Sequence, residues 1–180
     1  MDAFIIHGTF GHPGENWFPW LKEELEKLGY NVHVPTFPTP ENQSLESWRE
    51  VFSEYKVSND TILIGHSLGP AFILDILEKH KARAAFFVAG FTGLLDIKEV
   101  DSINKTIVDR NFDWETIKSN CKKFFVINSD NDPYVPIKKA KELASNLGTE
   151  PILVRDAGHF NEKAGYTSFP KLLEMIKECQ

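Results

Sequence analysis

From residue 61 the chain runs Thr61-Ile62-Leu63-Ile64-Gly65-His66-Ser67-Leu68-Gly69. Its first four residues are apolar or β-branched and too few for a helix, which predicts a short buried strand. After Gly69, apolar residues recur at steps of three and four, which predicts a helix. A strand that passes through Gly-x-Ser-x-Gly into a helix is typical of the strained turn that carries a nucleophilic serine. Ser67 is therefore the first candidate for chemistry.

Short apolar runs recur along the whole chain and predict its fold class. Each is too short for a helix, and the six predicted strands are residues 2–6, 31–34, 61–64, 84–89, 123–128 and 151–154. Helical patterns separate these strands. Strands that are apolar on both faces require helices on both sides of the sheet. We therefore expect an α/β fold with a mostly parallel six-stranded sheet, ordered 2-1-3-4-5-6.

The length of 180 residues fits a single domain that spans residues 1–180. One segment departs from the alternation of strands and helices. Residues 91–120 form a connection of unusual length, with a short helix predicted at Trp114 to Ser119. We interpret residues 91–120 as a small cap-like insertion over the site.

Composition and charge exclude several classes of partner. The net charge is −6 and the 20 Lys and Arg residues are scattered among 26 Asp and Glu residues, so no basic stripe exists for nucleic acid. Residues 1–8 contain no basic leader, and their apolar run is too short for a signal peptide or a membrane span. Only Cys121 and Cys179 are present, which suits a reducing compartment. We expect a cytoplasmic protein with neither nucleic acid nor membrane as a partner.

Two later segments follow predicted strands and carry polar groups that complement a serine. The strand ending at Ile127 is followed by Asp130-Asn131-Asp132-Pro133, and the last strand is followed by Gly158-His159-Phe160. Open α/β sheets gather functional groups at the carboxyl ends of their strands. An imidazole can accept the serine proton while a carboxylate fixes its tautomer, which predicts the chain order Ser67, Asp, His159. The carboxylate is Asp132 or Asp130, since either could instead stabilise a turn before the proline.

A serine nucleophile also needs backbone N–H donors for the oxyanion that forms during the reaction. One donor is expected from Leu68, the residue after the nucleophile. The other is expected from Thr9 or Phe10, because the loop after the first strand faces the Ser67 turn in the predicted sheet order. His7 and His12 lie on or beside this loop and are the alternatives to His159 as the base.

With these residues in place, the chain resembles the small single-domain serine hydrolases that include retinoblastoma-binding protein nine and similar bacterial hydrolases. The motifs that carry the resemblance are residues 61–67, Trp114-Glu115-Thr116-Ile117-Lys118 with Asn120-Cys121, Asp130-Asn131-Asp132-Pro133 and Gly158-His159-Phe160. The resemblance implies a triad of Ser67, Asp132 and His159. It also implies a compact α/β-hydrolase fold with a minimal cap and no cofactor. The Leu-x-Cys-x-Glu motif associated with retinoblastoma binding is absent, so we infer no such partner.

Four aromatic residues lie in or beside the loops that should surround Ser67, and we hypothesise that they line the substrate pocket: Phe91, Trp114, Tyr134 and Phe160. No metal is expected, because Tyr134 and Val135 occupy positions where a calcium loop needs a ligand and a glycine.

The predicted function is hydrolysis of a small-molecule ester or amide through an acyl-enzyme on Ser67, of the carboxylesterase or aminoacyl-amidase type. Nucleotide binding is disfavoured, because the loop after the first strand lacks the Gly-x-Gly-x-x-Gly spacing. The alternative is a catalytically weak hydrolase fold that acts as a protein-binding module.

Overall fold

The structure, a computed structural model, describes residues 1–179 and contains a six-stranded parallel sheet. The strands are β1 (Asp2–Ile6), β2 (Asn31–His33), β3 (Ile62–His66), β4 (Ala84–Val88), β5 (Phe124–Ser129) and β6 (Pro151–Val154). They pair in the order β2-β1-β3-β4-β5-β6, and each neighbouring pair is parallel. The predicted fold class and strand order are confirmed.

Short helices connect the strands. They are α1 (Phe18–Lys27), α2 (Leu45–Phe52), α3 (Gly69–Leu77), α4 (Lys98–Val108), α5 (Trp114–Asn120), α6 (Ile137–Leu147) and α7 (Pro170–Lys177), with a 3-10 turn η1 (Glu162–Ala164). Across residues 1–179, none of these helices combines the length and the apolar character that crossing a membrane requires.

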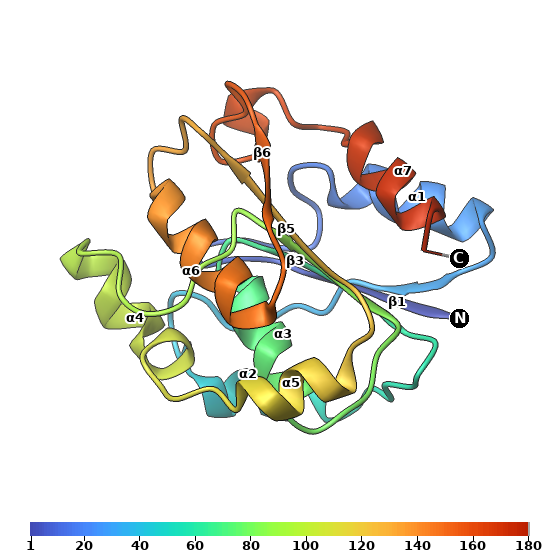
Figure 1. The fold of residues 1–180 in the computed structure, drawn as a ribbon, viewed down its shortest axis with the longest axis horizontal. Helices are drawn as coiled ribbons and strands as arrows, with labels where there is room; N and C mark the ends of the chain where they lie inside the picture. The colour runs from blue at the N-terminus through green and yellow to red at the C-terminus, as the bar shows by residue number, and fades with distance from the viewer. Residues whose placement is uncertain (180) are drawn as a thin grey trace.

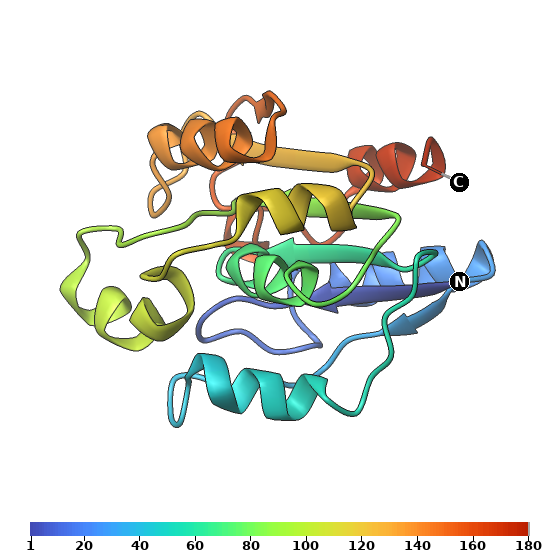
Figure 2. The ribbon, with the colours of Figure 1, turned by 60° about the horizontal axis from the view of Figure 1, so that its bottom comes forward.

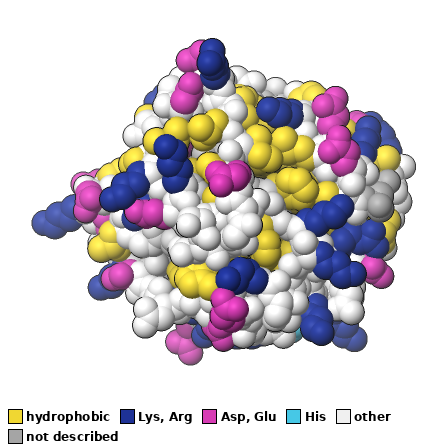
Figure 3. Space-filling model, viewed as in Figure 1, with side chains coloured by type: hydrophobic (Ala, Val, Ile, Leu, Met, Phe, Trp, Pro, Cys, Tyr) yellow, Lys and Arg dark blue, Asp and Glu magenta, His cyan; other side chains and the backbone are white. Residues whose placement is uncertain are grey.

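On the face seen in Figure 3, acidic and basic side chains are interspersed with apolar ones.

The sheet separates two hydrophobic cores. In β1, Phe4 and Ile6 pack into a core that includes buried residues of α2, α3 and α6, whereas Ala3 and Ile5 pack into a core with α1 and α7. Figure 1 shows α1 and α7 side by side, apart from the other helices. Because side chains alternate along a strand, this double coverage explains why the predicted strands were apolar at consecutive positions.

The segment 91–120 contains two helices, where the sequence predicted only the second. That second helix, α5, contacts α3 and α6, while α4 lies beyond the carboxyl ends of the strands (Figure 2). The buried residues of α4 are Asn104, Ile107 and Val108. Because one of its three buried positions is polar, the apolar periodicity that predicts a helix is interrupted there.

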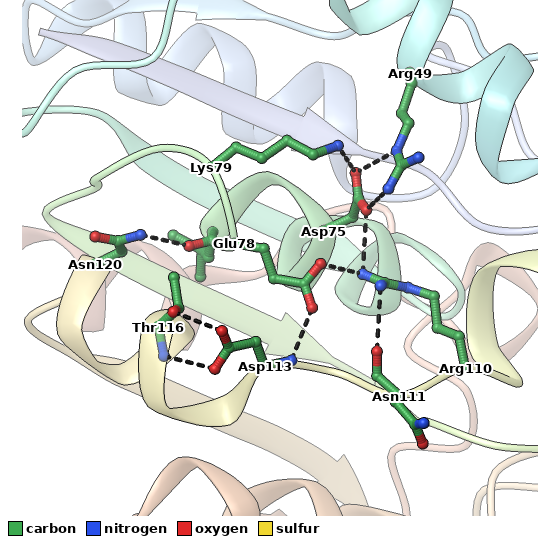
Figure 4. Close-up of polar contacts among 10 residues, drawn as sticks. Arg49, Asp75, Glu78, Lys79, Arg110, Asn111, Asp113, Thr116 and Asn120 are labelled. Carbon is green, nitrogen blue, oxygen red and sulfur yellow. Dashed lines mark hydrogen bonds and ion pairs between the residues drawn. The ribbon is translucent and has the colours of Figure 1, made fainter.

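A buried ion-pair cluster joins α2, α3 and the end of α4 (Figure 4). Asp75, of which 2% of the side chain is exposed, accepts hydrogen bonds from Arg49, Lys79 and Arg110 at 2.5 to 3.1 Å. Glu78 accepts a second bond from Arg110 at 2.7 Å. Burial alone would raise the pKa of Asp75, but the hydrogen bonds from Arg49 and Lys79 outweigh it and hold that pKa below its usual range. The cluster thus fixes the end of α4 to the sheet-covering helix α3.

Replacing the carboxylate should weaken the fold. We expect Asp75→Asn to lower the free energy of unfolding at neutral pH by about 3 kcal/mol, because three cations then lose their buried partner. Urea denaturation of both proteins measures the difference. The matched control is Asp60→Asn, since Asp60 pairs with Arg83 on the surface with 67% of its side chain exposed. That variant should lose less than about 1 kcal/mol, and equal losses in the two variants would contradict a structural role for the cluster.

Candidate active site

Ser67 occupies a sharp turn between the end of β3 and the start of α3. Its backbone has a φ of 58°, in the left-handed region that costs a residue with a side chain free energy. The Ser67 N–H donates to the carbonyl of Val88 in the neighbouring strand β4 at 2.9 Å, which helps to hold this conformation. The side chain lines a cavity of about 420 Å³ at the carboxyl ends of the strands.

Two glycines make the turn possible by allowing close backbone approach. A Cβ on Gly69 would lie 2.3 Å from the carbonyl oxygen of Ile6, so α3 could not begin against β1 with any larger residue. A Cβ on Gly8 would lie 2.7 Å from the Cβ of Ser67. The loop after β1 therefore contacts the serine turn directly, as the predicted sheet order required.

An imidazole and a buried carboxylate meet at the same cavity. His159 Nδ1 lies 2.8 Å from Asp132 Oδ2, and the exposed fractions of these side chains are 10% and 1%. The other carboxylate oxygen, Oδ1, accepts hydrogen bonds from the backbone N–H groups of Tyr134 at 2.9 Å and Val135 at 3.1 Å. When Nδ1 donates to Asp132, the second ring nitrogen of His159 is left as an acceptor. Both Ser67 and His159 line the cavity.

The structure places the alternative carboxylate elsewhere. Asp130 is exposed, and its Oδ1 accepts from the N–H of Asp156 at 2.9 Å rather than contacting His159. Between the two aspartates, the side chain of Asn131 accepts from the N–H of Gly158 at 2.7 Å and so ties the loop after β5 to the loop that carries His159. Within residues 1–179, no group of three His, Cys, Asp or Glu side chains is arranged to hold a metal ion.

The three N–H groups considered for the oxyanion differ in their hydrogen bonds. The N–H of Phe10 donates to Thr39 Oγ1 at 2.8 Å. Those of Thr9 and Leu68 donate to no acceptor in the part of the chain that the structure describes. The Thr9 hydroxyl donates to Asn104 Oδ1 at 2.6 Å, so a buried side chain of α4 fixes the residue. Of these three residues, Thr9 and Phe10 line the cavity, whereas Leu68 is fully buried and is not among the cavity residues.

The remaining histidines near the site have structural partners. His66 Nε2 lies 2.7 Å from the carbonyl oxygen of His159, and burial lowers the pKa of His66 to about 3. The neutral ring can therefore donate to that carbonyl. His7 is fully buried, and its Nε2 accepts from the N–H of Phe37 at 3.1 Å. His12 is exposed, and neither it nor His7 is among the cavity residues.

Two of the four predicted pocket aromatics line the cavity, namely Phe91 and Tyr134. The other two do not. Trp114 packs beside Phe112 and lines a separate open depression, because α5 lies against α3 and α6 rather than over Ser67. Phe160 is fully buried and stacks on Phe169 with ring centroids 5.3 Å apart, so it belongs to the core with α1 and α7.

Several cavity residues had no signal in the sequence. One group comes from the segment leading into and through α4: Leu95, Ile97, Val100 and Asn104. A second group comes from the loops after β1 and β6: Glu15, Asn16 and Asn161. The position of the loop after β1 was the one available signal, because this loop borders the point where the strand order reverses and where open α/β sheets bind their ligands.

Comparison with known proteins gives a consistent result. The profile of a family described as serine hydrolase matches residues 3–178. The chain is 32% identical over 182 residues to the putative hydrolase YdeN of Bacillus subtilis, covering 97% of this chain and 94% of that protein. It is 28% identical over 179 residues to the serine hydrolase RBBP9 of Rattus norvegicus, covering 97% and 93%. The crystal structure of the B. subtilis ydeN gene product aligns with a TM-score of 0.90 at 30% identity, over 99% and 97% of the two chains.

The low pKa of His66 can be measured directly. We expect its ring signals to keep the same chemical shift between about pH 8 and about pH 5, because the buried ring stays neutral. An unfolded histidine binds a proton near its ordinary pKa of 6.5, so His66 destabilises the folded state as the pH falls below that value. NMR titration, with His66→Gln to assign the signal, tests this. A midpoint near the ordinary value would show that the ring is not buried as described.

Proposed function

This chain belongs to the serine hydrolase family, and we propose that it cleaves small ester or amide substrates through an acyl-enzyme on Ser67. The observation that carries the proposal is the contact between His159 and the buried carboxylate of Asp132, at a cavity that Ser67 also lines. In this proposal, His159 is the general base, and Asp132 fixes its tautomer and stabilises the imidazolium.

In the first half of the proposed reaction, His159 takes the proton of the Ser67 hydroxyl as the oxygen bonds to the substrate carbonyl carbon. The carbonyl oxygen becomes an oxyanion. His159 then gives the proton to the leaving oxygen or nitrogen, whose bond to carbon breaks. In the second half, His159 takes a proton from a water whose oxygen bonds to the acyl carbon. The bond between that carbon and Ser67 Oγ then breaks, His159 returns the proton to Oγ, and a carboxylic acid is released.

We assign the oxyanion to the N–H groups of Leu68 and Thr9. The N–H of Phe10 is already engaged by Thr39, whereas the hydroxyl of Thr9 is held by Asn104 close to Ser67. Removing one such donor typically costs about two to three orders of magnitude in turnover. The positive φ of Ser67 supports this assignment, because in the strained turn that carries a nucleophilic serine the N–H of the following residue typically serves the oxyanion.

The proposed substrates are small. The cavity of about 420 Å³ holds a short acyl group and its leaving group. We interpret residues 91–120 as a minimal cap that contributes through the segment before α4 and through α4 itself, because Phe91, Leu95 and Val100 line the cavity while α5 contacts α3 and α6. The cavity suits both a carboxylesterase and an aminoacyl amidase.

Ser67 should be the single site of covalent inhibition. We expect a fluorophosphonate to add one phosphonyl group to the wild-type protein and none to Ser67→Ala, and that variant should lose ester hydrolysis by on the order of 10³-fold or more. Intact-mass spectrometry and nitrophenyl ester turnover measure the two effects. Ser119→Ala, which changes an exposed serine of α5, is the control and should label like wild type. Labelling that persists in Ser67→Ala would place the nucleophile elsewhere.

Substitutions of Asp132 and Asp130 should have very different effects on kcat. We expect Asp132→Asn to lower kcat by on the order of 10⁴, because the amide favours the wrong tautomer of His159. Asp130→Asn should have little effect, since an amide oxygen can still accept from the N–H of Asp156. Steady-state kinetics on a nitrophenyl ester compares the variants. A larger loss at Asp130 would move the carboxylate of the triad by two residues.

A further inference from the structure

The cavity has two chemically different sides. Apolar side chains from the segment before and within α4 form one side, including Leu95, Ile97 and Val100. The other side surrounds His159 and is formed by the loops after β1 and β6, with Glu15, Asn16 and Asn161. Asn16 and Glu162 join these two loops through a pair of hydrogen bonds at 2.9 and 3.2 Å. The polar side is therefore a fixed part of the cavity.

Glu15 supplies the only carboxylate among the residues that line this cavity, and the lining includes no Lys or Arg. It is half-buried, and within residues 1–179 it forms no salt bridge. Burial raises the pKa of Glu15, and the charge of Glu162 adds to this effect. The charge of His12, a hydrogen bond from the backbone of His12 and the charge of His159 oppose it without cancelling it. A carboxylate that has lost water without gaining a cation is stabilised when a ligand brings a positive charge.

An aromatic ring borders the same imidazole. Tyr134 lines the cavity, 42% of the residue is exposed, and its ring centroid lies 5.0 Å from that of His159. Aromatic faces attract ammonium groups, above all quaternary ones. The ring of Tyr134 therefore lies beside the general base, and the carboxylate of Glu15 lines the same cavity.

The need for His159 to protonate the leaving atom determines which part of a substrate lies near Glu15 and Tyr134. His159 must reach the leaving atom to protonate it, so the leaving group lies on the side of His159. The acyl group is then directed to the apolar side, toward Leu95 and Val100. Resting on the proposed acyl transfer, we propose that the preferred substrate is an apolar acyl ester of an alcohol that carries an ammonium group, recognised by Glu15 and Tyr134. Hydrolysis by water releases a carboxylic acid and the ammonium alcohol.

A pair of isosteric esters tests the proposal. Butyrylcholine and 3,3-dimethylbutyl butyrate have leaving groups of nearly the same shape, but only the first is charged. We expect the wild-type kcat/KM to favour the cationic ester by about tenfold, which corresponds to about 1.4 kcal/mol. Glu15→Gln should bring the ratio close to one, because the ammonium group of the cationic ester then loses its carboxylate partner. Tyr134→Leu should lower the ratio about threefold.

Glu23→Gln is the charge-matched control, because it removes one negative charge from an exposed position of α1 and should keep the wild-type ratio. Equal kcat/KM values for the two esters in wild type would overturn the inference and leave the proposed hydrolysis standing. An equal loss of kcat/KM for both esters in Glu15→Gln would also overturn the inference, since Glu15 would then act on His159 rather than on the leaving group. If wild type cleaves neither ester nor a nitrophenyl ester, the proposed function fails, and the inference fails with it.

Discussion

The strained turn at Ser67 is the constraint on which the rest of the site depends. A φ of 58° is unfavourable for serine, and it persists because the surrounding backbone leaves no alternative. The N–H of Ser67 is bonded to β4, and α3 begins so close to β1 that only glycine fits at position 69. The same turn reaches the opposite loop, because the preceding residue, His66, is bonded through its ring to the carbonyl of His159. The short connection between β3 and α3 thus positions both Ser67 and the backbone of His159 before any substrate binds.

Much of this arrangement was predictable from the sequence, because it depends on local patterns and on topology. Short apolar runs identify buried strands, and a parallel sheet places the residues that follow its strands at one edge. Ser67 and His159 were found in this way, and the structure brings both to one cavity. The residue pattern alone left Asp130 and Asp132 open, because both follow the same strand, and the resemblance to the small serine hydrolases implied Asp132. In the structure Asp132 contacts His159, whereas Asp130 accepts from the N–H of Asp156.

Other features depend on contacts between distant parts of the chain, which no local pattern encodes. The engagement of Phe10 by Thr39 and the direction in which α5 packs are of this kind. Helix α4 was missed because Asn104, one of its buried residues, is polar, and its side chain holds Thr9 instead of filling the core. Glu15 had no signal at all, because a single acid in a loop is ordinary until the fold encloses it.

We propose that the Ser67 turn presents the hydroxyl to a carbonyl whose oxygen is held by the N–H groups of Leu68 and Thr9. A crystal structure of the covalent phosphonate adduct tests it most directly, because the phosphoryl oxygen stands in for the oxyanion of the transition state. We expect phosphorus bonded to Ser67 Oγ, with the phosphoryl oxygen about 2.7 to 3.1 Å from the backbone nitrogens of Leu68 and Thr9. The N–H of Phe10 should still be bonded to Thr39. An adduct on another residue, or an oxygen bound by Phe10 or facing away from Leu68, would contradict it.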